Sequence, residues 1–212
     1  MHKKSTLIKT LFALLISLSI LFALSLQFSY ILNTAKASNI SKFQAAGRFF
    51  LFFTVLSHLI LASSLLVIII KPFSALGKFF STTSTATAIA VYIFFVGLIY
   101  NLLLRNLWQP QGWQLVANEL LHVVIPIFYV LFWFFFFPKT SLNWKHPFQW
   151  LIYPAVYLFY MLIRGAVEGF YPYPFLNANE LGYSKTFLNA GVLLLTLVAI
   201  AFSFVAISRL QK

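Results

Sequence analysis

The sequence predicts an all-α protein, a polytopic bundle of six transmembrane helices with both termini on the same side of the membrane. Hydrophobic residues make up 61% of the 212 positions and charged residues only 8%. Apolar stretches of about twenty residues, long enough to cross a bilayer, recur along the chain. Cysteine does not occur in the sequence, which excludes disulfides, a thiolate nucleophile and sulfur ligands for a metal.

We expect one integral membrane domain, residues 1–212, with spans at about 7–32, 49–70, 83–104, 116–137, 150–168 and 186–207. The first span follows a basic start, as a secretory signal does, but its roughly 26 residues exceed the usual 7 to 15 of a signal core and indicate a retained helix. In the second span, Thr54, Ser57 and His58 share one helical face because they are three and four residues apart. The small hydroxyl residues that open the third span, from Ser81 to Thr87, favour close helix packing.

The fourth span carries Glu119 and His122, although an acid in hydrocarbon costs on the order of 2.5 to 3.5 kcal/mol on insertion scales. Pro126 removes one backbone hydrogen bond from this span and predicts a kink. The fifth span contains Arg164 and Glu168 four residues apart, and the sixth is almost wholly apolar. We expect lipid-facing or interfacial positions for the aromatic run and four tryptophans, namely Phe132 to Phe137, Trp108, Trp113, Trp144 and Trp150.

The net charge of +12 arises from 15 Lys and Arg against 3 acids, and the basic residues lie mostly in the short connections. There they orient the protein and contact anionic headgroups, so we expect a membrane environment and no nucleic-acid partner. Nine lie on the face that bears the termini and five on the opposite face, which predicts cytoplasmic termini. The nine are Lys3, Lys4, Lys9, Lys71, Lys78, Lys139, Lys145, Arg209 and Lys212, and the five are Lys36, Lys42, Arg48, Arg105 and Lys185.

Threading the six spans places the intramembrane polar residues near the face opposite the termini. This layer predicts one shallow polar pocket that lipids can enter laterally. Its members are Thr54, His58, Tyr100, Asn101, Glu119, His122, Arg164, Glu168 and the loop Tyr171-Pro172-Tyr173-Pro174.

A hydroxyl nucleophile needs a nearby base, and histidine is suited to that role. Thr54 and His122 can play these parts if the second and fourth spans are adjacent. Glu119 could orient the His122 ring or simply cap its own helix. Tyr100, Asn101 or Tyr173 could donate to an oxyanion.

Several alternatives stay open. Arg164 could pair with Glu119 or Glu168 as a structural clamp, or bind a carboxylate or phosphate. His58 fits an interhelical hydrogen bond. A metal site built from His58, His122 and Glu119 has permissible ligands but no supporting spacing motif, so we expect neither a metal nor a cofactor. The stiff loop with Pro172 and Pro174 could be a lid or an interfacial turn.

The segment WLIYPAVYLFYMLIRGAVEGFYPYPFLN, residues 150–177, followed by Gly182-Tyr183, resembles the signature of the bacterial Pr-six-Pr membrane family. That family is similar to the eukaryotic androgen-induced-gene and androgen-dependent TFPI-regulating proteins, which are membrane threonine hydrolases of fatty acid esters of hydroxy fatty acids. The resemblance implies catalytic roles for Thr54 in FFTVLS and His122 in LLHVVIP. It also implies a multi-pass protein of the inner, cytoplasmic membrane of a bacterium. His58 stands where many relatives have asparagine.

Together these patterns predict a lipid-ester hydrolase that acts on a lipid or acyl ester entering from the bilayer. Thr54 would form an acyl-enzyme, with His122 as base and then acid. The alternative is a small membrane transporter or lipid-binding scaffold without catalysis. The chain has no internal inverted repeat, which argues against the transporter.

Overall fold

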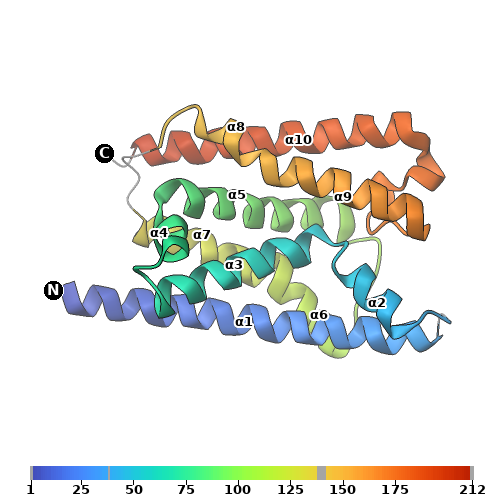
Figure 1. Ribbon diagram of the computed structural model, residues 1–212, viewed down its shortest axis with the longest axis horizontal. Coiled ribbons are helices and arrows are strands. Elements are labelled where there is room, and N and C mark those ends of the chain that lie inside the picture. The colour runs from blue at the N-terminus through green and yellow to red at the C-terminus, as the bar shows by residue number, and fades with distance from the viewer. Residues whose placement is uncertain (1, 38, 138–141, 211–212) are drawn as a thin grey trace.

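The computed structural model describes residues 2–37, 39–137 and 142–210, and within these ranges it contains helices and no strand. Six of its helical segments are long and apolar enough to cross a membrane. In Figure 1, α1 begins and α10 ends at the same end of the bundle. The six-span, all-α prediction is therefore confirmed. The spans are Thr6–Ala35, Phe53–Ile70, Thr83–Leu104, Gly112–Phe136, His146–Glu168 and Ala178–Arg209.

Several spans consist of more than one helical element. The elements in chain order are α1 (His2–Ala37), α2 (Lys42–Phe49), α3 (Phe53–Ile70), α4 (Ala75–Ser81), α5 (Thr83–Ile99), η1 (Tyr100–Leu104), α6 (Gly112–Glu119), η2 (Leu120–Val124), α7 (Ile125–Phe136), α8 (His146–Trp150), α9 (Ile152–Glu168), η3 (Pro174–Leu176) and α10 (Ala178–Leu210). The elements η1 and η2 are single π-helical turns that extend α5 and join α6 to α7. Such turns are rare and occur frequently at functional sites.

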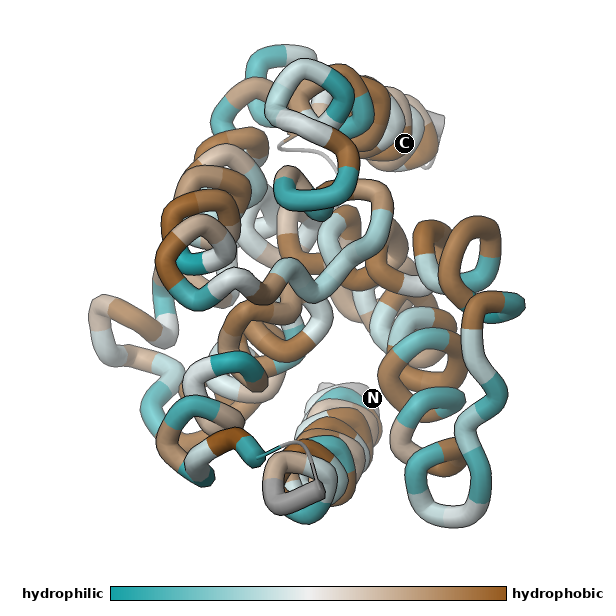
Figure 2. Tube along the Cα trace, turned by 90° about the vertical axis from the view of Figure 1, so that its right-hand side faces the viewer, coloured by the Kyte–Doolittle hydropathy of each residue, from teal (hydrophilic) through white to brown (hydrophobic). Residues whose placement is uncertain are grey.

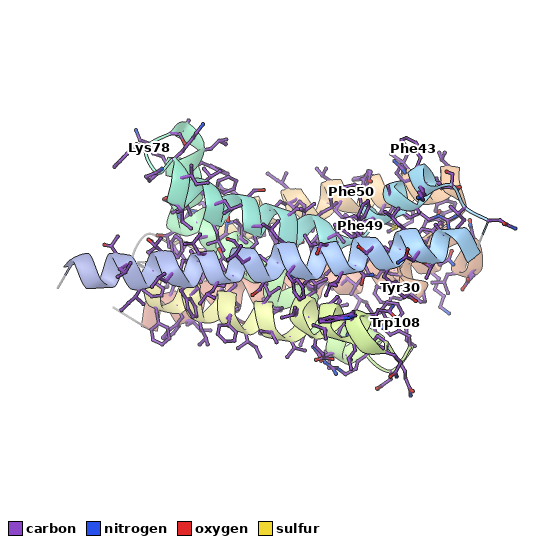
Figure 3. All side chains as sticks on the ribbon, turned by 90° about the horizontal axis from the view of Figure 1, so that it is seen from below. Tyr30, Phe43, Phe49, Phe50, Lys78 and Trp108 are labelled. Carbon is purple, nitrogen blue, oxygen red and sulfur yellow. The ribbon has the colours of Figure 1, made fainter. Side chains whose placement is uncertain are left out.

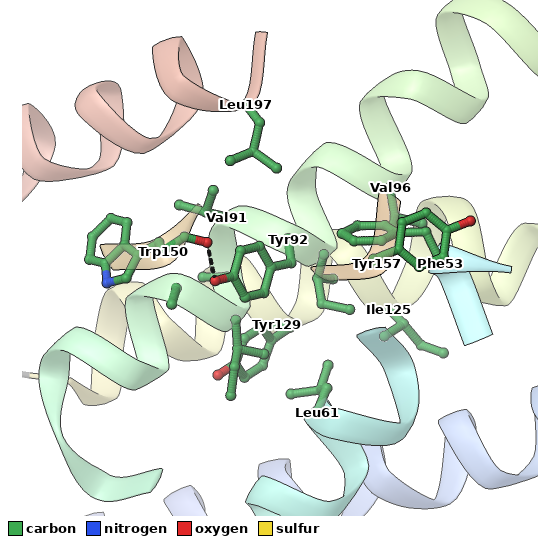
Figure 4. Packing of buried hydrophobic residues seen from close by; sticks show 14 of the residues in the cluster. Phe53, Leu61, Val91, Tyr92, Val96, Ile125, Tyr129, Trp150, Tyr157 and Leu197 are labelled. Carbon is green, nitrogen blue, oxygen red and sulfur yellow. Dashed lines mark hydrogen bonds between the residues drawn. The ribbon is translucent and has the colours of Figure 1, made fainter. Parts of the chain in front are cut away.

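The helix α5 forms the centre of the bundle. It lies between α1 with α3 on one side and α9 with α10 on the other (Figure 1), and Figure 2 shows the same bundle end-on, with many hydrophobic residues along its helices. Figure 4 shows its Val91, Tyr92 and Val96 among buried side chains from several other helices. The buried core therefore passes through α5. At the end away from the termini, η1 continues this helix and carries Tyr100, a residue of the candidate site.

The second span is shorter than the expected range 49–70, because residues 42–49 form the separate helix α2. Ser41 caps α2 by accepting the Gln44 N–H at 3.1 Å. The Phe43 side chain of α2 is 91% exposed and lies at the end of the bundle away from the termini (Figure 3). The separation places the start of α3 at Phe53, one residue before Thr54.

The expectation that Phe132 to Phe137 and Trp150 face lipid or the interface is wrong for several of these residues. Phe132 and Trp150 are buried, whereas Phe135 is 70% exposed. The indole of Trp150 donates to the Ser84 hydroxyl at 3.1 Å, and that of Trp133 donates to Thr87 at 2.7 Å. Hydroxyl groups on α5 thus hold these indoles inside the bundle, at the end that bears the termini.

Candidate active site

Thr54 is the second residue of α3. Its Oγ1 lies 3.4 Å from Nε2 of His122, which belongs to the π turn η2 of the fourth span. The first N–H groups of a helix have no acceptor within that helix, and the N-terminus carries partial positive charge. The nucleophile candidate therefore stands where the backbone favours a developing negative charge. The contact also meets the condition that the pairing required, namely that the second and fourth spans lie next to each other.

The backbone carbonyl of Asn118 orients the His122 ring. Nδ1 of His122 lies 2.9 Å from this oxygen, one helical turn earlier. Because a carbonyl only accepts, Nδ1 carries the proton in this contact. Nε2 then presents its lone pair to the Thr54 hydroxyl, which is the tautomer that a general base requires.

Tyr100 fixes the other face of the imidazole. Its ring stacks on His122 with 4.0 Å between centroids and 20° between planes. The side-chain amide of Asn118 donates to the Tyr100 hydroxyl at 2.5 Å. Asn118 thus holds both rings, one with its backbone and one with its side chain.

Pro126 explains why Asn101 reaches the site. In an α-helix, the His122 carbonyl would accept the N–H of residue 126, which proline lacks. The Asn101 amide donates to this carbonyl at 3.2 Å, and also to the Gly97 carbonyl at 2.8 Å. A Cβ at Gly97 would lie only 3.1 Å from the same His122 oxygen. The kink predicted from proline is realised as a π turn with an interhelical hydrogen bond.

The loop between α9 and η3 acts as a lid over Thr54. The Tyr173 hydroxyl accepts the Phe53 N–H at 2.9 Å and lies close enough to interact with Thr54. Burial raises the pKa of this hydroxyl above its ordinary value, so it remains a neutral donor. The ring of the neighbouring Tyr171 packs directly on Gly165 of α9, where the missing Cβ makes room for it. Of the two readings left open for this loop, the contacts fit the lid.

Two cavities meet at the candidate catalytic residues. The first, of about 310 Å³, lies between α5, α9 and α10, and the second, of about 290 Å³, lies between α1, α6 and the lid. Both are of the size at which small-molecule sites begin. Five residues line both cavities: Thr54, Tyr100, Leu104, His122 and Tyr173. Thr54 and His122 therefore stand in the wall between the two cavities, within reach of a molecule in either one.

His58 is buried behind Thr54 and lines neither cavity. Its Nδ1 lies 2.7 Å from the Thr54 carbonyl, one turn back on the same helix. This contact ties the first turn of α3 together. The ring also lies close enough to interact with the backbone of Leu121 in η2, which agrees with the interhelical hydrogen bond expected for His58. Within residues 2–37, 39–137 and 142–210, no group of three His, Asp or Glu is placed to hold a metal ion, so the geometry does not support the metal alternative.

Glu119 bonds to Arg105 and not to the His122 ring. It forms a bidentate ion pair with Arg105, with N–O distances of 2.9 and 3.0 Å. Arg105 Nε also donates to the Asn101 side-chain oxygen at 2.7 Å. The ring nitrogen that Glu119 could have oriented bonds to the Asn118 carbonyl instead. The orienting role considered for Glu119 is therefore wrong.

Arg164 and Glu168 pair with each other and line neither cavity. A Cβ at Gly47 would lie 3.0 Å from Arg164 Nη2, so the pair rests on the backbone of α2. Next to it, the Arg48 guanidinium lies 4.5 Å above the Phe170 ring. These contacts fit the structural clamp, here between α9 and α2. Because Arg164 lines neither cavity, they do not support a role for it in binding a ligand there.

Sequence reasoning missed Asn118 and the partner of Glu119. Asn118 precedes His122 by four residues on one helical face, and this spacing is a signal that could have found it. Arg105 had no such signal, because its ion pair depends on how two spans meet. Comparison of the chain with protein-family models, with curated proteins and with solved structures finds no match.

Proposed function

We propose that the protein is an integral membrane lipid-ester hydrolase with Thr54 as nucleophile and His122 as general base. The observation that carries the proposal is the 3.4 Å contact between Thr54 Oγ1 and His122 Nε2 at the meeting point of two cavities. A nucleophile, a base and a group that orients the base are the parts that acyl transfer needs. A contact of this length fits a resting site, where catalytic hydrogen bonds are often long before substrate binds.

In the first half-reaction, the Thr54 oxygen attacks the ester carbonyl carbon while its proton passes to Nε2 of His122. The carbonyl oxygen becomes an oxyanion, and the neutral Tyr173 hydroxyl is the proposed donor to it. The intermediate then collapses: the ester C–O bond breaks, and the proton on Nε2 goes to the departing alcohol oxygen. An acyl-threonine remains.

In the second half-reaction, water gives a proton to Nε2 and attacks the acyl carbon. The bond to Thr54 breaks, the proton returns to its oxygen, and a fatty acid is released. Throughout, Nδ1 of His122 donates to the Asn118 carbonyl, which stabilises the imidazolium that forms twice in the cycle. Tyr100 holds the ring in plane by stacking.

The substrate class that we propose is a fatty acid ester of a hydroxy fatty acid, as the resemblance to the Pr-six-Pr family implies. The predominantly apolar walls of the cavities support a lipid that enters from the bilayer. The excess of basic residues on the face that bears the termini, nine against five, supports a place in the inner membrane of a bacterium with both termini cytoplasmic.

Labelling with a fluorophosphonate, which reacts with activated hydroxyl nucleophiles, tests the proposal on the purified full chain in detergent. We expect labelling and ester hydrolysis in the wild type and a fall of about 10³-fold or more in both Thr54→Ala and His122→Ala. Ser57→Ala is the matched control, because its hydroxyl lies one turn along α3 and bonds to Tyr153 at 3.0 Å. Full esterase activity in a folded Thr54→Ala protein would overturn the assignment. Ligand binding or flux without product would favour the scaffold or transporter.

A further inference from the structure

The second cavity has a polar group that the proposed reaction does not use. Gln27 of α1 lines this cavity together with the catalytic pair, whereas α1 contributes nothing to the wall of the first cavity. The Gln27 side chain is half-buried, in an apolar helix more than one turn from either end. Its carboxamide offers two N–H donors and one acceptor oxygen.

The Gln27 carboxamide has no hydrogen-bond partner in the part of the chain that the structure describes. Other polar residues of α1 behave differently: Ser17 bonds to the Ala13 carbonyl at 2.8 Å, and Ser25 bonds to the Phe22 carbonyl at 2.7 Å. An unsatisfied polar group inside a membrane costs several kcal/mol. An unpaired amide that faces a cavity is therefore available to a ligand.

The two cavities differ in what their far walls offer. Away from the shared residues, the first cavity is apolar apart from Tyr157, whose hydroxyl already donates to the Leu51 carbonyl at 2.8 Å. The second cavity has the amides of Gln27 and Asn118, and the latter is occupied by Tyr100. An unsubstituted acyl chain thus fits the first cavity without leaving a polar group of the wall unsatisfied. A chain that carries an oxygen function fits the second cavity, where it can bond to the free amide.

We propose that the second cavity is the chamber for the alcohol half of the ester, and that Gln27 hydrogen-bonds an oxygen function, carboxyl or hydroxyl, carried by that half. The inference rests on the proposed function and adds a specificity-determining residue to it. Trp108, which is 45% exposed (Figure 3), and Pro172 also line this chamber. The chamber therefore lies where the α5–α6 connection and the lid meet. The alcohol can leave by this route while the acyl group stays on Thr54 in the first cavity. The vacated chamber then admits the water that attacks the acyl-threonine.

The test compares three esters with the same acyl chain: one of a hydroxy fatty acid, one of glycerol, and one of an unsubstituted long-chain secondary alcohol. They are offered to the full chain in detergent micelles. We expect Gln27→Leu to lower kcat/KM by about tenfold for at least one oxygen-bearing ester and by less than about twofold for the unsubstituted one. A fall in kcat/KM for the hydroxy fatty acid ester identifies the oxygen function as a carboxyl, and a fall for the glycerol ester identifies it as a hydroxyl.

Ser25→Ala is the matched control, because this exposed residue lies on the same helix and its hydroxyl bonds to the Phe22 backbone carbonyl of that helix. The unfolding temperature of Gln27→Leu should stay equal or rise, because the substitution removes an unpaired amide from an apolar helix. An equal loss on all three esters, no loss on any, or a fall in the unfolding temperature would overturn the inference. Thr54→Ala separates the two proposals: if it hydrolyses all three esters, the proposed function fails, whatever Gln27→Leu does.

Discussion

The side-chain amide of Asn101 donates to the backbone carbonyl of His122 across 3.2 Å and so joins the third span to the fourth at the proposed base. The bond exists because Pro126 brings no N–H to this carbonyl. A polar residue at a helix surface thus replaces a lost backbone hydrogen bond. The position of His122 relative to Thr54 then depends on a contact that neither residue makes directly.

Replacing Asn101 with Leu should lower kcat by about tenfold and the free energy of unfolding by about 1 kcal/mol, because the His122 carbonyl loses a donor. Hydrolysis rates and denaturant unfolding of the detergent-solubilised protein measure the two effects. Adding Pro126→Ala returns an N–H to the helix beside this carbonyl and should restore part of the stability. A single Asn101→Leu variant with wild-type kcat would show that the bond does not position His122.

Replacing Tyr173 with Phe should lower kcat by about 10²-fold and leave KM within about twofold, because the proposed hydroxyl donor acts on the oxyanion rather than on bound substrate. Tyr171→Phe is the control, because Tyr171 lines neither cavity and its hydroxyl lies beside Tyr183 of α10 rather than beside Thr54. Steady-state kinetics on one ester is sufficient. If both variants behave alike, the oxyanion donor is another group.

Replacing Glu119 with Gln should leave kcat and its pH profile within about twofold of the wild type. The Glu119 carboxylate bonds to Arg105 rather than to His122, and this bond raises the pKa of the Arg105 guanidinium. Both side chains are more than a third exposed, so solvent screening limits the stability cost to below about 1 kcal/mol. Arg105→Gln should cost more, since Arg105 also holds Asn101. A pH profile displaced in Glu119→Gln alone would restore an orienting role for this acid.

Replacing Ala190 with Phe should shift the preferred acyl chain to a shorter length. Ala190 is a buried small residue of α10 in the wall of the first cavity, and the added ring would fill part of its roughly 310 Å³. Competition between esters that differ only in acyl length gives the preference. Val192→Phe is the control, because Val192 lies two residues away and is 57% exposed. An unchanged preference in a folded Ala190→Phe protein would place the acyl chain elsewhere.

The interior of this protein was harder to predict than its spans. Phe132 and Trp150 looked like lipid-facing residues, yet both are buried. The reason is that lipid and a helix interior are equally apolar, so hydrophobicity alone does not distinguish them. The start of the second span was also misplaced at residue 49, because the apolar, phenylalanine-rich run from Phe49 to Phe53 continues across the break between α2 and α3.

By itself, the sequence determined that the chain has six apolar helices, and it placed Thr54 and His122 in one layer near the face opposite the termini. Length, hydropathy and residue counting are sufficient for this, because a bilayer fixes how far each helix extends. The tertiary structure alone decided that Asn118 orients His122, that Glu119 pairs with Arg105, and that Thr54 lies between two cavities. These contacts either join residues from different helices or depend on how a helix is rotated about its own axis. That rotation is set by packing against neighbouring helices rather than by the residue pattern along one helix.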